Sequence, residues 1–90
     1  MKANFFTYII TYKDNSISSV CRKLFNSISE AEREAFSEFD FGKNSIVQYT
    51  ISKIDQYSDE IIYGVYAHDY REWLLHYKIH ILPMEIAQDD

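Results

Sequence analysis

Three residue types are scarce in this sequence, which has one cysteine, one proline and two glycines among 90 residues. The lone Cys21 cannot form an internal disulfide, so we expect no dependence on an oxidising compartment. Two glycines are too few for a glycine-rich loop that binds phosphate. No apolar run approaches the roughly 20 residues that a membrane-spanning helix needs. These absences predict a protein without a membrane segment.

The residues that are present are typical of one small globular domain over residues 1–90. Hydrophobic residues make up 47% and charged residues 26% of the chain, a balance that folded domains share and disordered chains lack. The first four residues are followed by only two aromatics before Thr7, which is not a secretory signal pattern. We therefore expect a cytoplasmic protein.

The net charge of −5 is distributed unevenly along the chain. Residues 1–25 carry +3, residues 26–60 carry −5 and residues 61–90 carry −3. A negative field disfavours nucleic-acid phosphate, because affinity for phosphate comes from lysine and arginine. The same field attracts a basic partner over a long range. The charge therefore favours a basic protein surface as the partner.

Alternation of apolar and polar residues predicts strands near both ends of the chain. Residues 5–12 are rich in β-branched and aromatic residues, and the polar residues 13–16 predict a turn into a second strand over 20–25. A third strand is expected over 45–56, and a hairpin turn then leads into a fourth strand over 60–68. Gly64 within that strand indicates a bulge or a close approach of another backbone.

The sequence from Ser27 to Glu30 matches a capping box, so we expect a helix to begin there. Gly42 is expected to end it in a left-handed conformation. Helical spacing predicts a core stripe, with Phe36 at its border. The stripe consists of Ile28, Ala31, Ala35 and Phe39.

The last segment fits two structures. Residues 74–82 alternate as a strand does, with Leu75, Tyr77, Ile79 and Ile81 inward, whereas a second capping-box match over 69–72 fits a helix. The strand fits better, and Pro83 should end either element. The expected fold is α+β: two strands, one main helix, then two or three strands, forming a four- to five-stranded antiparallel sheet with the helix on one face.

Candidates for chemistry are few. His76 and His80 on a strand would lie about 13 Å apart, too far to share a metal ion. Cys21 has no identifiable partner that could activate it as a nucleophile. Paired carboxylates on an exposed helix face have nothing to raise a pKa. We therefore predict no catalytic residues, no metal and no cofactor.

Acidic and tyrosine residues are the candidates for binding a partner. Glutamates four residues apart on one helix face repel one another, which suggests that the face has a use. Tyrosines around the fourth strand alternate with acids, and tyrosine is enriched in protein interfaces. The expected partner-binding residues are Glu30, Glu34, Glu38, Asp40, Asp55, Tyr57, Asp59, Glu60, Tyr66 and Tyr70.

The order of elements carries a resemblance. A strand Tyr8-Ile9-Ile10-Thr11-Tyr12-Lys13, a return over 20–25 and the helix start Ser27-Ile28-Ser29-Glu30-Ala31 precede an antiparallel meander. This resembles small phage-encoded proteins, among them anti-CRISPR inhibitors of type I surveillance complexes. The resemblance implies a non-enzymatic inhibitor that blocks a basic, nucleic-acid-binding surface of a Cas complex in the host cytoplasm.

Two other functions are compatible with the sequence. The chain could be a structural or regulatory subunit that forms a homodimer through a sheet edge or its tyrosines. It could also bind nucleic acid through the basic residues of the first hairpin, which the overall charge disfavours. Those residues are Lys2, Lys13, Arg22 and Lys23.

Overall fold

The computed structural model describes residues 3–40 and 47–86. Along the chain the elements are β1 (Ala3–Tyr12), β2 (Ile17–Val20), α1 (Ile28–Ser37), β3 (Tyr49–Gln56), β4 (Ile61–Asp69) and β5 (Glu72–Ile86). The strands form one antiparallel sheet in the order β2-β1-β5-β4-β3, so β5 lies at its centre between β1 and β4. The expected α+β class, with an antiparallel sheet and one helix, is confirmed.

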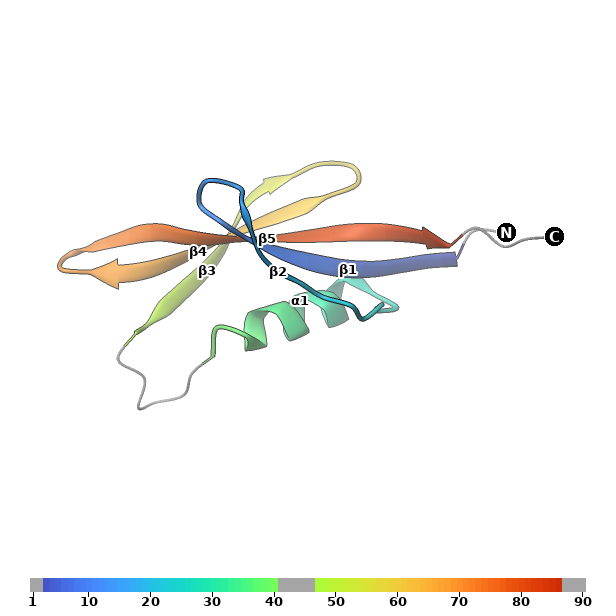
Figure 1. Cartoon of the computed structure of the whole chain (residues 1–90), viewed down its shortest axis with the longest axis horizontal. Coiled ribbons are helices and arrows are strands. Elements are labelled where there is room, and N and C mark those ends of the chain that lie inside the picture. The colour runs from blue at the N-terminus through green and yellow to red at the C-terminus, as the bar shows by residue number, and fades with distance from the viewer. Residues whose placement is uncertain (1–2, 41–46, 87–90) are drawn as a thin grey trace.

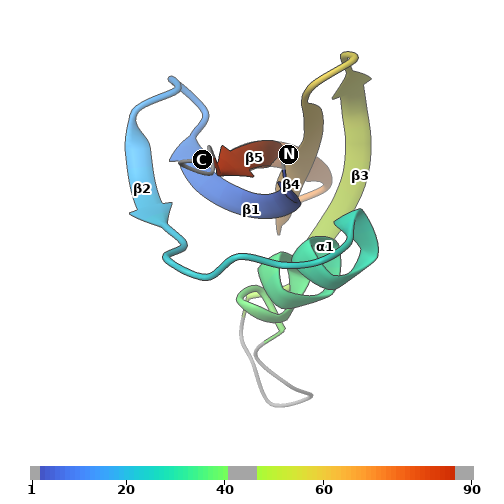
Figure 2. The same cartoon turned by 90° about the vertical axis from the view of Figure 1, so that its right-hand side faces the viewer.

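The helix packs on one face of the sheet, against β1 and β5 (Figure 1). Figure 2 shows β2 and β3 at the two sides of the sheet and α1 beneath β1. Alternate residues of the central strands meet the two fully buried alanines of the helix. The core consists of Tyr8, Ile10, Ala31, Ala35, Tyr63, Val65, Ile79 and Ile81.

The helix begins where the capping box predicts. Ser27 is the N-cap, and its Oγ accepts a hydrogen bond from the backbone N–H of Glu30 at 3.2 Å. The Glu30 carboxylate accepts from the N–H of Asn26 at 3.2 Å, one residue before the cap. Of the predicted stripe, Ala31 and Ala35 are buried and Phe39 packs on the core, whereas Ile28 is exposed. Gly42, the expected helix end, lies outside the described residues.

The second strand lies earlier than predicted, over Ile17–Val20 rather than 20–25. After β2, the N–H of Cys21 still donates to Tyr8, but the chain then leaves the ladder until Phe25 pairs with Phe6. A side chain replaces the missing ladder bonds, because the Thr7 hydroxyl donates to the carbonyl of Lys23 at 3.0 Å.

The last segment is a strand, and Pro83 does not end it. β5 continues to Ile86, and Pro83 pairs with Phe6 of β1. The backbone groups of Phe6 bond to Phe25, away from β5, so the groups of Pro83 point away from β1 as well. On that side the pairing of β4 with β5 extends only as far as Ile81. The missing N–H of proline therefore costs no ladder hydrogen bond.

A register shift explains why Leu75 departs from the predicted inward face. Gly64 itself pairs in register with Lys78, and the ladder between β4 and β5 shifts just after it, between Val65 and Tyr66. A Cβ on Gly64 would lie 3.1 Å from Leu75 Cδ1 and 2.8 Å from Tyr66 Cε2. Two side chains, rather than another backbone, occupy the space above the glycine.

Candidate interaction surface

The turn between β3 and β4 carries exposed acidic and aromatic side chains. The N–H of Tyr57 donates to the carbonyl of Glu60 at 2.7 Å and closes the turn. The Tyr57 hydroxyl donates to Asp55 Oδ2 at 2.6 Å, and this hydrogen bond raises the pKa of the Tyr57 phenol above its usual value. The Tyr57 side chain is therefore oriented while it remains 53% exposed. Asp59, also exposed, completes this acidic turn.

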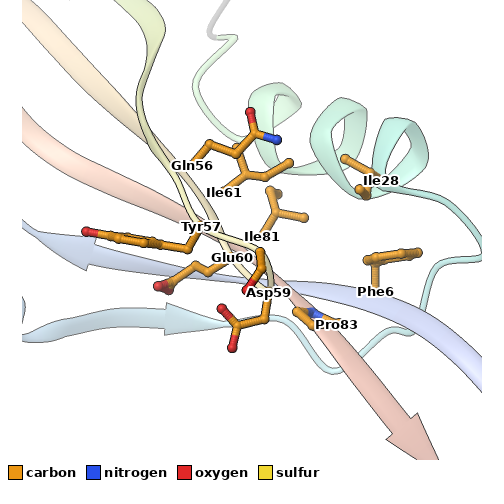
Figure 3. A pocket seen from close by; sticks show the side chains of 10 residues that line it. Phe6, Ile28, Gln56, Tyr57, Asp59, Glu60, Ile61, Ile81 and Pro83 are labelled. Carbon is orange, nitrogen blue, oxygen red and sulfur yellow. The ribbon is translucent and has the colours of Figure 1, made fainter.

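A small pocket of about 120 Å³ lies between the acidic turn and the start of the helix (Figure 3). Ile28 and Phe6 line it on one side, and Tyr57 and Asp59 line it from the turn. The pocket therefore places the turn beside Ile28, the first residue of α1.

Glu60, at the end of the turn, belongs to a chain of three side chains. Its Oε2 lies 3.1 Å from His80 Nδ1, and His80 Nε2 lies 2.9 Å from Thr11 Oγ1. An ionised carboxylate can only accept, so Nδ1 is the donor to Glu60, while Nε2 forms the hydrogen bond with the Thr11 hydroxyl. This chain ties the turn to β5 and β1. Alternation along the sequence places His80 opposite the face of Ile79 and Ile81, but it does not reveal this chain of contacts.

The acids of the helix have partners within the fold. Glu30 caps the helix, and Glu34 lies 3.6 Å from the ammonium of Lys23 in an exposed pair. Glu38 accepts a hydrogen bond from the Tyr8 hydroxyl. An exposed ion pair contributes little to stability and is readily exchanged. These contacts give the acids of the helix structural roles, which the spacing of the glutamates along the helix does not reveal.

Two tyrosines reach from the sheet to the helix in the same manner. Tyr8 donates to Glu38, and Tyr63 donates to Glu32 Oε1 at 2.5 Å. Burial, followed by these hydrogen bonds, raises the pKa of both phenols well above the usual range. Both hydroxyl groups therefore keep their protons to a higher pH than an ordinary tyrosine does, and they link the helix to the sheet.

The remaining predicted residues lie apart from the turn. Tyr66 covers Gly64 in β4. Tyr70, at the tip of the β4–β5 hairpin, is 95% exposed and has a left-handed backbone with φ of 57°. Asp40 follows the helix. The structure thus divides the ten predicted residues among the helix and its end, the acidic turn and the β4–β5 hairpin.

The described residues contain no arrangement typical of a metal site or of a membrane-spanning helix. Within 3–40 and 47–86, no three His, Cys, Asp or Glu side chains are placed to hold a metal ion. Across those residues, no helix combines the length and the apolar character needed to cross a bilayer. Lys13, Arg22 and Lys23 of the basic hairpin are exposed, and Lys2 lies outside the described residues.

The fold and surface define a small α+β domain with an acidic turn. Neither a protein-family model, nor a curated protein, nor a solved structure matches this chain.

Proposed function

We propose that this chain is a non-enzymatic inhibitor that binds a basic, nucleic-acid-binding surface of another protein. The observation that carries the proposal is the acidic turn, where Asp55, Tyr57 and Asp59 are exposed together and Asp55 orients the tyrosine. An oriented tyrosine gives contact area at low entropic cost, and the acids complement a basic partner. The net charge of −5 adds attraction at long range.

Binding to immobilised poly-L-lysine at 50 and 200 mM NaCl tests the charge complementarity. Replacing Asp55→Asn together with Asp59→Asn should weaken binding about threefold or more at the lower salt concentration. The matched control, Asp69→Asn with Glu72→Gln, removes the same charge from the β4–β5 hairpin and should weaken binding less. Equal losses in both variants would show that only net charge matters and would contradict a specific role for the turn.

Because the order of elements resembles that of phage-encoded inhibitors, we propose a type I Cas surveillance complex as the partner. Target-DNA binding by such a complex, loaded with its guide RNA, should decrease as this protein is added. The variant at Asp55 and Asp59 should inhibit less than the unchanged chain. Undiminished DNA binding at saturating protein would remove that complex as the partner.

A second function, self-association, is favoured by the edge strand β2. Ile17 and Val20 are 64% and 55% exposed on a strand that pairs only with β1 among the described strands. Exposed apolar edges invite pairing with another copy. If two copies pair through β2, sedimentation equilibrium should show a dimer that Ile17→Lys converts to a monomer. A monomer at every concentration tested would eliminate this function.

A further inference from the structure

The pocket between the acidic turn and the start of α1 has an apolar interior (Figure 3). Ile61, Ile81 and Pro83 line its base, and Phe6 and Ile28 line its wall on the side of the helix. We refer to it as the turn–helix pocket. All five side chains are hydrocarbon, so the interior favours an apolar occupant.

The pocket lies where the sheet becomes narrower. The pairing of β4 with β5 begins at Ile61 and Ile81, so the rest of β5 pairs only with β1 among the described strands. Pro83 therefore has no neighbouring strand on the side of β4 and stays exposed. Ile28 lines the same space and is 36% exposed, although helical spacing predicts it in the core. The end of the ladder thus leaves an apolar space that the described part of the chain does not fill.

The rim of the pocket on the side of the turn is acidic. Asp59 lines the pocket and is exposed, and within residues 3–40 and 47–86 its carboxylate has no hydrogen-bond or ion-pair partner. Asp55, exposed beside Tyr57, adds a second carboxylate to this side. An acidic segment would be repelled here, whereas lysine or arginine beside the pocket would be attracted. The occupant that fits is therefore apolar and has basic neighbours.

We propose that the turn–helix pocket binds one aliphatic side chain within a basic segment of the partner. This inference rests on the proposed function and adds an apolar contact to its charged one. The pocket volume of about 120 Å³ is about ten times what one water molecule needs, so it holds a single side chain such as leucine but no longer piece of chain. The basic residues on either side of that leucine then lie at the rim, where they meet Asp55 and Asp59.

Two acetylated and amidated peptides of equal charge, Lys-Lys-Leu-Lys-Lys and Lys-Lys-Ala-Lys-Lys, test the apolar contact. Each is titrated at low salt into the isotope-labelled chain, and NMR follows the backbone amide resonances. The leucine peptide should bind about threefold or more tightly, because alanine leaves most of the pocket empty. It should also shift the resonance of Ile28, across the pocket from the acidic turn. The alanine peptide should shift mainly the resonances of the turn.

Two matched variants, whose amide spectra verify the fold before titration, locate the contact. Ile28→Asn should remove the preference for leucine, because it makes the wall of the pocket polar. Ile54→Asn makes the same change at an isoleucine that is 41% exposed outside the pocket, and should preserve the preference.

Equal affinities of the two peptides for the unchanged chain, or a preference that survives Ile28→Asn, would overturn the proposal. If the peptides bind equally and Asp59→Asn weakens both, the pocket is excluded and the proposed function stands. If neither peptide binds, this inference falls together with the attraction of the turn for basic segments.

Discussion

At the scale of single residues, Tyr8 and Tyr63 connect the sheet to the helix through their hydroxyl groups. Both phenols have a pKa raised above the value of about 10 that an exposed tyrosine has in the unfolded chain. The folded state therefore holds these two protons more tightly. Their contribution to stability is complete below pH 10 and is lost as the pH rises above it.

We expect the free energy of unfolding to fall above pH 10 by up to about 1.4 kcal/mol per pH unit for each of the two tyrosines. Urea denaturation between pH 9 and 11.5 measures this slope. Replacing Tyr8→Phe and Tyr63→Phe should flatten it. Tyr70→Phe is the control, because that side chain meets solvent in the folded chain too. An equal slope in the unchanged chain, in the variant at Tyr8 and Tyr63, and in the Tyr70→Phe control would disprove the assignment.

Gly64 has a different constraint, which is the space above its Cα. A Cβ there would lie 2.8 Å from Tyr66 Cε2 and 3.0 Å from the Tyr66 hydroxyl oxygen, closer than side chains normally approach. Gly64→Ala should therefore destabilise the fold by about 1–2 kcal/mol, as overpacking does.

A double-mutant cycle tests this cause. Gly64→Ala should cost clearly less in a Tyr66→Ala background, because the ring that crowds the new Cβ is gone. Chemical denaturation of the four proteins gives the coupling free energy. Purely additive effects would mean that the ring of Tyr66 is not what requires glycine at this position.

At the scale of secondary structure, the start of α1 depends on one hydroxyl group. Ser27 Oγ accepts from the N–H of Glu30, a donor that otherwise has no partner within the helix. Ser27→Ala should lower the free energy of unfolding by about 1 kcal/mol. Ser29→Ala, at an exposed position of the same turn, should change it by less than about 0.5 kcal/mol. Similar losses in both variants would contradict the capping role.

How much of each element the sequence predicted depends on how local its determinants are. The helix start could be predicted because Ser27 and Glu30 are three residues apart and interact directly. Pro83 could not be placed inside β5, because its tolerance depends on where Phe6 directs its backbone groups and where β4 ends. Strand ends are set by partners that are distant in sequence, which a local pattern does not reveal.

The candidate site shows the same difference. The acidic turn was predicted, because Asp55, Tyr57 and Asp59 are close together in the sequence. The contact between Tyr8 and Glu38 spans 30 positions, and that between Thr11 and His80 spans 69. Such pairs exist only once the sheet order is known. The contacts of the helix acids within the fold are of this kind, so the sequence pattern alone does not reveal them.

At the scale of the whole molecule, the structure is elongated because the sheet extends past the helix at both ends, with the β4–β5 hairpin at one end and the paired β1 and β5 at the other (Figure 1). The principal extents are 57 × 25 × 19 Å, and the Cα radius of gyration is 14.7 Å. A compact chain of this length would have a radius of about 12 Å. The hairpin tip and the acidic turn are thus separate projections from one sheet, and a partner could contact either without covering both.

Small-angle scattering of the purified chain should therefore give a radius of gyration near 15 Å at the mass of a 10.7 kDa monomer. An inhibitor that acts as a single copy requires the mass of a monomer, because its turn must be free to reach the partner surface. Twice the mass, with a larger radius, would instead indicate pairing of two copies and favour self-association through β2. A monomer with a radius near 12 Å would contradict the elongated sheet, because about 12 Å is the radius of a compact chain of this length.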